Sequence, residues 1–504
     1  MEPRAAYDEL IRRTREQALL GSCSALLGWD EQTYMPRGGA EHRGHQMALL
    51  AGLRHERATD PRLGELLAAV EGTDLVADPE SPEAVNVREI RRSYDRQTRL
   101  PRSLVEELAR TTTIAQQEWV TARRENDFPR FRPWLERVMD LKRQEAEYLG
   151  YDEVAYDALL DEYEPGARSR DLAALFDALR LELVPLATAI ASAPRRPDVV
   201  ILHREYPIDR QRLFGETAAA AVGFDFERGR LDTSAHPFCT GIGPGDCRLT
   251  TRYDPHDFGQ AFFGILHEVG HGLYEQGLDP EHHGTPMGEA VSLGVHESQS
   301  RLWENAVGRS RAFWIYWFPL ARQIFREALR DVSLDQFHFA VNHVEPSLIR
   351  VEADEVTYNL HILIRFELER ALLSGDLPVG DVPGAWAEKY QQYLSLTPPN
   401  DTAGCLQDIH WSAGLVGYFP TYTLGNLYAA QFFAQATAEL GDPGPAFARG
   451  EFAPLLAWLR DRIHRHGQRF RSAALVERVT GRPPDHRPLL QALRSNYGML
   501  YGVA

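Results

Sequence analysis

Two histidines one helical turn apart, with a glutamate between them, are the residues of this sequence best suited to chemistry. His267, Glu268 and His271 lie in the stretch GILHEVGHGLYEQG and form an HExxH pattern. On a helix, positions 267 and 271 share one face, so both imidazoles can reach one metal ion. Zinc held in this way acidifies a water molecule, and Glu268 takes the proton as general base while an amide carbonyl is attacked. The pattern predicts a metal-dependent hydrolase.

A catalytic zinc site also needs a third protein ligand and one open position. The stretch GEAVSLGVHESQSRL, on a second expected helix, offers His296 and Glu297. A carboxylate from the following helix is the usual third ligand in one class of HExxH peptidases, and the short HExxHxxGxxH spacing of another class is absent here. We therefore predict Glu297 as the third ligand. The alternative is a surface ion pair between Glu297 and Arg301, four residues on.

An ordinary amphipathic helix that contains two histidines by chance is the alternative to a metal site, because HExxH is a short motif. The residues around the HExxH motif favour a metal site over a chance occurrence. Apolar Ile265, Leu266 and Val269 flank the histidines, while Gly270 and Gly272 permit other backbone to approach closely.

Three other histidine-containing stretches compete less well for the metal site. EHHG at 281–284 lies in a Pro/Gly loop, and HRH at 464–466 lies in a basic stretch expected at the surface. FHFAVNHVE offers His338, His343 and Glu345, but it lacks two histidines at i, i+4 with an adjacent base. We place all three outside the primary site.

Helices are the elements that must position these residues, because most of the chain carries the helical period of apolar residues. Breaks fall at clusters of Pro, Gly and Asp, and none is long enough to be a flexible linker. No repeat of fixed period stands out. The sequence predicts an all-α protein built as one large helical unit, in one or two lobes around the site.

The exception to the helical pattern is Ala235–Pro255, which directly precedes the HExxH helix. Glycines and prolines surround the alternating segment CRLTTRY. One face of a strand here would carry Leu249 and Thr251, and the other would carry Arg248 and Thr250. We predict a small β-ribbon that lies beside the HExxH helix.

The amino-acid composition limits the classes of partner and the cellular compartments that we expect for the protein. The 504-residue chain has a formal net charge of −17, which disfavours nucleic-acid and anionic-membrane partners. Four scattered cysteines suit a reducing compartment, and neither a signal peptide nor a membrane-spanning segment is visible. The cytoplasm is the expected location.

Several ordered motifs make the sequence resemble the M32 metallocarboxypeptidases, the thermostable carboxypeptidase Taq family. Besides HExxH it contains HPF at 236–238, DCRLT at 246–250, HESQ at 296–299, IRVEAD at 349–354 and GCLQDIHW at 404–411. GWDEQTYMPRGGAEHRGHQMALLAGL near the N-terminus and GYFPTYTLGNLYAAQ near the C-terminus also resemble the family. The resemblance therefore covers essentially the whole chain.

This resemblance implies a fold and an activity. The fold would be a single domain over residues 1–504, saddle-like and almost entirely helical, with a deep groove, in a protein that is commonly a homodimer. The activity would be release of single C-terminal amino acids from peptides that have a free C-terminal carboxylate. His267, His271 and Glu297 would hold one zinc ion per chain, with Glu268 as general base. Cobalt or manganese are possible substitutes, because ligand type alone does not fix the metal.

Recognition of a C-terminal carboxylate suits an arginine, whose two parallel N–H donors match the two carboxylate oxygens. Arg248, on the predicted strand, and Arg350 are the candidates. Either could instead be structural: Asp246 is an obvious partner for Arg248, and acidic residues at 352–355 lie close to Arg350 in the chain. The sequence does not decide between the two arginines.

Further residues are candidates for contacts with the substrate or the transition state. His410, Tyr418 and Tyr422 can donate a hydrogen bond to an oxyanion or pass a proton to the departing amine, or they can be satisfied core residues. Gln407 is expected to support the site or contact the substrate backbone. We expect His236 to close one end of the groove.

Two rival functions remain open. A metallo-endopeptidase or peptidyl dipeptidase on a similar helical groove would use the same residues. A catalytically silent protein that binds metal or peptide as a scaffold is the second rival, but a pure metal store has no need of Glu268 beside the two histidines.

Overall fold

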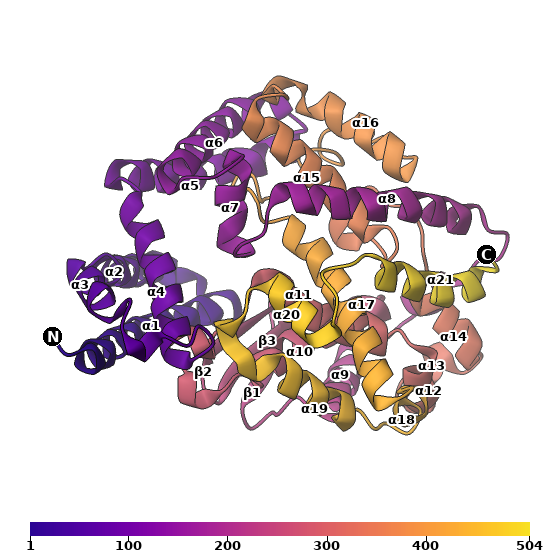
Figure 1. Ribbon diagram of the computed structural model, residues 1–504. Helices are drawn as coiled ribbons and strands as arrows, with labels where there is room; N and C mark the ends of the chain where they lie inside the picture. The colour runs from indigo at the N-terminus through magenta and orange to yellow at the C-terminus, as the bar shows by residue number, and fades with distance from the viewer. Residues whose placement is uncertain (504) are drawn as a thin grey trace. The chain divides into compact units, whose positions relative to one another are not determined.

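The computed structural model describes residues 1–503. Helices make up 69% of it, and the strands form one three-stranded sheet (Figure 1). The predicted all-α class with a small β element is confirmed. The chain divides into two compact units. Unit 1 comprises Met1–Thr98, Asp198–Val341 and Phe432–Pro483, and unit 2 comprises Arg99–Pro197, Asn342–Gln431 and Pro484–Ala504.

Unit 1 carries both the sheet and the HExxH helix. Its helices are α1 (Pro3–Thr33), α2 (Ala40–Ala58), α3 (Pro61–Val70), α4 (Pro82–Arg99), α9 (Ile208–Val222), α10 (Phe258–Glu275), α11 (Leu293–Arg301), α12 (Arg311–Ile324), α13 (Arg326–Leu329), α14 (Leu334–Val341), α18 (Gly444–Phe447), α19 (Ala453–Arg462) and α20 (Ser472–Thr480). The C-terminal half of α17 (Pro420–Leu440) also belongs to it.

The sheet of unit 1 has the strand order β1-β3-β2. Its strands are β1 (Gly229–Thr233), β2 (Phe238–Gly243) and β3 (Asp246–Thr251). The antiparallel pair β2–β3 is the ribbon expected from the sequence, which is confirmed. Strand β1 was not predicted: it pairs with β3 in the parallel sense, and its short, polar segment GRLDT gives no alternating signal.

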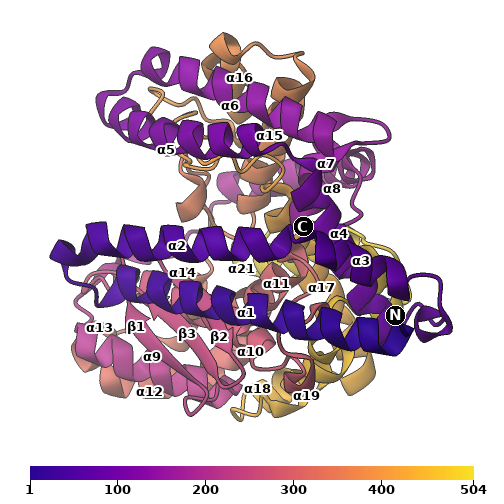
Figure 2. The ribbon, with the colours of Figure 1, turned by 90° about the vertical axis from the view of Figure 1, so that its left-hand side faces the viewer.

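The two faces of the sheet meet different helices. On one face, a Cβ at Gly272 of α10 would lie 3.0 Å from the side chain of Leu249. On the other face, the Arg248 guanidinium lies 4.2 Å from the ring centroid of Trp29 on α1. Figure 2 shows α1 running past the sheet with α2 beside it. Helix α1 is in contact with both β2 and α2. The predicted alternation of Arg248 and Leu249 is confirmed.

Helix α10 is anchored at its start. Asp257 caps it by accepting a hydrogen bond from a backbone N–H of the first turn, which leaves one fewer unpaired donor. Phe258 and Phe262 then pack into an aromatic cluster with Phe214 of α9 and Trp314 of α12. This packing fixes the helix whose second half carries the HExxH motif.

Unit 2 contains helices and loops, and no strand, in the part that the structure describes. Its helices are α5 (Arg102–Glu125), α6 (Phe128–Leu149), α7 (Ala155–Tyr163), α8 (Ser169–Ser192), α15 (Tyr358–Ser374), α16 (Val382–Leu394), the N-terminal half of α17, and α21 (Arg487–Tyr501). Helix α15 is its central element, since most of its residues are buried.

One buried carboxylate ties three parts of unit 2 together. Glu369 of α15 accepts hydrogen bonds from Tyr156 of α7 at 2.7 Å, from the indole N–H of Trp411 at 3.0 Å and from the backbone N–H of Gly417 at 3.1 Å. The segments QDIHW and GYFPTY are therefore both fixed to α15.

None of the helices within residues 1–503 combines the length and the apolar character that a membrane span requires.

Candidate metal centre

Helices α10 and α11 bring the three predicted metal ligands together in unit 1. The Nε2 atoms of His267 and His271 lie 3.6 and 3.4 Å from Oε2 of Glu297. The three ligand atoms lie within 4.8 Å of one another, and within residues 1–503 no other trio of His, Cys, Asp or Glu meets this spacing. A tetrahedral zinc ion with bonds near 2.1 Å separates its ligand atoms by about 3.4 Å. The trio therefore fits one metal ion.

The absence of a side chain at Gly270 allows this convergence. A Cβ at this position would lie 2.4 Å from the carbonyl oxygen of Gln299 and 2.5 Å from Cα of Ser300. Real Cβ atoms do not approach other atoms so closely, so only glycine lets the α11 backbone lie directly on α10. The close approach predicted at this position is confirmed, and it carries Glu297 to the histidines.

A carboxylate holds the far side of the His267 ring. Nδ1 of His267 lies 2.9 Å from Oε2 of Glu304, so the Nε2 atom remains for a metal. Glu304 lies on a π-helical turn, Leu302–Val307, that continues α11 without a break. Burial alone would raise the pKa of Glu304, but Arg301 and His267 lower it to about 2. Glu304 is thus an ionised acceptor.

A second histidine holds the far side of His271. Nδ1 of His271 lies 2.5 Å from Nδ1 of His296, and Nε2 of His296 lies 2.9 Å from Oε1 of Glu275. His296 therefore lies behind a ligand and is not part of the converging trio. The two histidines have different supports: His267 contacts a carboxylate directly, and His271 reaches one through an intervening imidazole.

The two oxygens of Glu297 have different partners. Oε1 accepts a hydrogen bond from Nε of Arg301 at 2.7 Å, while Oε2 faces the two histidines. The ion pair that we considered as an alternative is therefore present. It is not a surface pair, because Glu297 is only 7% exposed. The same carboxylate can form this ion pair and bind a metal.

Electrostatics favour a positive charge at the centre of the trio. Burial alone would raise the pKa of Glu297, but Arg301 and the two histidines hold it well below its usual range. Burial alone would lower the pKa of His267, but the carboxylates of Glu297 and Glu304 raise it overall. A buried, ionised carboxylate between two imidazoles suits a divalent cation.

Glu268 is buried beside the ligands, with 6% of its surface exposed. Burial raises the pKa of its carboxyl group to about 7. A carboxyl group of this kind exchanges a proton near neutral pH, as a general base must.

The remaining candidates of unit 1 lie on or before the sheet. Nε and Nη2 of Arg248 each donate to Asp246 at 2.8 Å, so the local ion pair considered for it is present. Arg248 lies on the sheet face that meets α1 and not on the face that meets α10. His236 is exposed, and its backbone carbonyl accepts a hydrogen bond from Ser234 at 2.6 Å.

In unit 2, the structure gathers Arg350 and the QDIHW segment into one buried cluster. Nε of Arg350 donates a hydrogen bond to Oδ1 of Asp408 at 2.9 Å, and Nη2 of Arg350 lies 2.8 Å from the same oxygen. Arg365 of α15 contacts the other oxygen of Asp408 at 2.6 Å. The partner of Arg350 in this cluster is thus Asp408 and not one of the acidic residues near it in the chain. Asp354 instead accepts hydrogen bonds from backbone N–H groups before α15, including that of Thr357 at 3.0 Å.

Gln407 is engaged inside the same cluster. Its Oε1 accepts from the backbone N–H of Arg350 at 2.9 Å and from Arg365 at 2.7 Å, and its Nε2 donates to the carbonyl of Leu348 at 3.0 Å. Its side chain therefore orders the loop around Arg350.

His410 and two tyrosines form a partly buried group in unit 2. Nε2 of His410 lies 3.3 Å from the hydroxyl of Tyr422, and the ring centroids of Tyr418 and Tyr422 lie 5.4 Å apart. Burial lowers the pKa of His410 to about 4, so its imidazole is neutral near pH 7. The neutral ring can donate or accept a hydrogen bond, but it does not carry the second ring proton of an imidazolium.

Among the other histidines, His464 was placed wrongly by the sequence pattern. It is fully buried, and a Cβ at Gly277 would lie 2.3 Å from its Nδ1 atom. His338 is also buried and contacts the backbone carbonyl of Arg309 at 3.2 Å. Neither belongs to the metal trio.

The supporting residues Glu275 and Glu304 were not predicted from the sequence. Both have a helical spacing that could have revealed them: Glu275 follows His271 by four residues, and Glu304 follows Glu297 by seven.

Comparison with known proteins identifies the family. Residues 9–497 match the model of the family described as Carboxypeptidase Taq (M32) metallopeptidase. The chain belongs to the M32 metallopeptidase family. The resemblance noted from the sequence motifs is thus confirmed, and this M32 protein is a metal-dependent peptide hydrolase of the carboxypeptidase type.

Individual relatives agree with this M32 assignment over 95% or more of their lengths. Thermostable carboxypeptidase 1 of Thermus thermophilus is 56% identical over 512 residues, covering 100% of both chains. Carboxypeptidase 1 of Bacillus subtilis is 37% identical and 95% of each chain is covered. The crystal structure of an M32 carboxypeptidase from Deinococcus radiodurans R1 superposes with a TM-score of 0.95 at 45% identity, covering 99% of this chain and 100% of that chain.

Proposed function

We propose that this M32 carboxypeptidase uses one zinc ion per chain to release single C-terminal amino acids from peptides. The observation that carries the proposal is the convergence of His267 Nε2, His271 Nε2 and Glu297 Oε2 at separations that suit one tetrahedral ion. When bound, such an ion supplies Lewis-acid chemistry, which polarises a peptide carbonyl and acidifies water. The remaining steps fall to side chains of the protein.

Glu268 is the proposed general base. It takes the proton of the attacking water and afterwards returns it, either to the departing amine directly or to the side chain that has protonated this amine. Its burial supports this role, because a carboxyl group with a pKa of about 7 both accepts and returns a proton near neutral pH.

Arg248 and Arg350 are the two candidates for the residue that binds the substrate's C-terminal carboxylate. Both guanidinium groups are preorganised by an aspartate: Asp246 holds Arg248, and Asp408 holds Arg350. Such pairing fixes the direction of the remaining N–H donors, so the arginine loses little side-chain freedom when an anion binds. Separate substitution of each arginine by lysine, with KM as the readout, would identify which one binds the carboxylate.

The phenol groups of Tyr418 and Tyr422, with His410, are the proposed donors to the oxyanion and to the leaving amine. The contact between His410 and Tyr422 supports a role for these two as a pair. Because His410 is neutral near pH 7, a tyrosine hydroxyl is the better proton donor of the two. Gln407 supports Arg350 from behind, and we retain His236 as a residue at the end of the substrate groove.

Zinc is the proposed metal, with cobalt or manganese as substitutes, because a His/His/Glu set accepts several divalent ions. The homodimer and the cytoplasmic location implied by the resemblance are also kept as proposals. Analytical ultracentrifugation and cell fractionation would test them.

The activity is tested with an N-blocked peptide of defined sequence. The proposal expects one free amino acid after another to appear by mass spectrometry, and expects no reaction when the C-terminus is amidated or a chelator is present. Internal cleavage would favour an endopeptidase, and release of dipeptides would favour a peptidyl dipeptidase. Zinc-loaded protein that hydrolyses no peptide of a C-terminal library would favour the scaffold function.

A further inference from the structure

His271 is supported from behind by two side chains that are neither metal ligands nor general base. Its Nδ1 atom lies 2.5 Å from Nδ1 of His296, and the rings are tilted by 35° with centroids 4.6 Å apart. Nε2 of His296 lies 2.9 Å from Oε1 of Glu275. The three residues form a single hydrogen-bonded chain that runs from the metal trio to a carboxylate.

The chemistry of this chain fixes the positions of its protons. If Nε2 of His271 binds a metal through its lone pair, the ring proton must lie on Nδ1, which then donates. Nδ1 of His296 must accept this hydrogen bond, so the proton of the neutral His296 ring lies on Nε2. That proton is donated to Glu275, which as a carboxylate only accepts. Each contact in the chain therefore has one donor and one acceptor.

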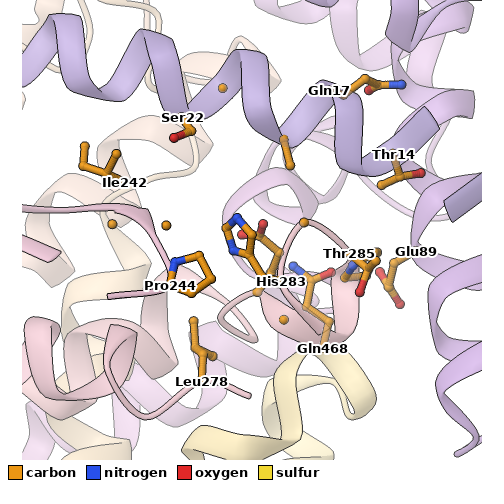
Figure 3. A pocket seen from close by; sticks show the side chains of 18 of the residues that line it. Thr14, Gln17, Ser22, Glu89, Ile242, Pro244, Leu278, His283, Thr285 and Gln468 are labelled. Carbon is orange, nitrogen blue, oxygen red and sulfur yellow. The ribbon is translucent and has the colours of Figure 1, made fainter. Parts of the chain in front are cut away.

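Glu275 is placed for this contact by its surroundings. It follows His271 by one turn on α10, and a Cβ at Gly241 of β2 would lie 2.5 Å from its Oε2 atom. A glycine at 241 therefore leaves the space that the carboxylate occupies. Glu275 also lies on the wall of a cavity of about 830 Å³, which His283 and Pro244 line as well (Figure 3).

We propose that His296 and Glu275 are positioning residues for the metal site. They hold the His271 ring in one tautomer and one orientation, with Nε2 directed at the ion, and thereby raise the affinity of the protein for metal. The proposal rests on the proposed metal-binding function of His267, His271 and Glu297. It assigns Glu275 an effect that passes entirely through His296.

Zinc affinity, measured by competition with a chromophoric chelator, tests the proposal on the full-length protein. His296→Leu removes the acceptor, and we expect the affinity for zinc to fall about 10- to 100-fold, as for other residues that support a metal ligand. His296→Asn should restore part of the loss, because its Oδ1 can accept at the position of Nδ1. Glu275→Gln should weaken zinc binding to a smaller extent.

The double variant His296→Leu/Glu275→Gln separates positioning from a general loss of charge. If Glu275 acts through His296, the double variant should bind zinc as His296→Leu does, and the two effects will not add. Additive losses would overturn the proposed chain. His55→Leu, a change of the same type on the wall of the same cavity, is the matched control and should leave zinc affinity within about twofold of wild type. Circular dichroism of the metal-free variants reports whether each is folded.

Zinc binding by variants of the metal ligands distinguishes a failure of this proposal from a failure of the proposed metal site on which it rests. If His267→Ala and His271→Ala bind zinc as wild type does, the proposed metal site is wrong. If these two variants lose zinc while folded His296→Leu and His296→Asn both bind it with wild-type affinity, the metal site stands and the positioning proposal is wrong.

Discussion

His464 is hydrogen-bonded to Gln299, with 2.9 Å between Nε2 of the histidine and Oε1 of the glutamine. The contact joins the short helix that follows α19 to the helix that carries Glu297. Since a glutamine Oε1 only accepts, the imidazole must donate through Nε2–H. The support of the metal helix therefore includes a fully buried histidine.

His464 makes the stability of the protein dependent on pH. Burial lowers the pKa of His464 to about 3, whereas the unfolded chain takes up the proton near the ordinary value of about 6.5. Because the folded-state pKa is the lower one, stability is retained above pH 6.5 and lost as the pH falls toward 3. Between pH 7 and pH 5 the loss due to this residue is about 2 kcal/mol.

Urea unfolding of wild type and His464→Gln at pH 7, 6 and 5 measures this loss. The variant, which has no proton to take up at this position, should lose less stability on acidification. Equal losses for the two proteins would show that His464 does not exclude its proton in the fold.

Replacing Gly270 by alanine should separate α10 from α11. The added methyl would overlap the backbone of Gln299, and overpacking of this kind costs about 1–3 kcal/mol. Because Glu297 would move with α11, affinity for zinc should fall as well. Denaturant unfolding and zinc titration check the two effects. Gly52→Ala in α2 is the control: it has open space and should be neutral or slightly stabilising.

Glu268→Gln should separate metal binding from catalysis. The amide cannot accept the proton of the attacking water, so kcat should fall by about 10²- to 10⁴-fold. The three metal ligands are unchanged, so zinc content by mass spectrometry should remain one ion per chain. An active Glu268→Gln enzyme would exclude this residue as the base.

Removal of the Asp408 carboxylate should strongly destabilise unit 2. Asp408→Ala leaves the guanidinium groups of Arg350 and Arg365 buried without their shared partner, which costs about 3–5 kcal/mol. Glu106→Ala, which breaks an exposed pair with Arg102, is the control and should change stability by less than about 1 kcal/mol. Chemical unfolding of both variants gives the comparison. A small effect of Asp408→Ala would mean that the two arginines find other partners or water.

The sequence was sufficient for the centre of the site because its residues are close in the chain. The spacing of His267 and His271 depends only on helix geometry, and Glu297 follows on the next helix. The β2–β3 ribbon was likewise predictable from local alternation. Each of these features is fixed by neighbours within a few tens of residues.

Features that depend on distant residues were not predictable. Arg350 has acidic neighbours in the chain, yet its partner is Asp408, 58 positions away. His464 is flanked by arginines that suggested a surface position, but its burial depends on contacts with Gly277 and Gln299. Strand β1 depends on parallel pairing with β3, which leaves no local pattern.

The three proposed metal ligands, the proposed base Glu268 and the residues that directly support the two histidines all come from one uninterrupted stretch, Phe258–Val307, which spans α10, α11 and the π-helical turn. A gene rearrangement with breakpoints outside this stretch would move the whole set together. The residues proposed to recognise the substrate lie mostly on other stretches. Evolution can therefore alter which peptides are bound while the proposed metal ligands and the proposed general base are inherited as one block.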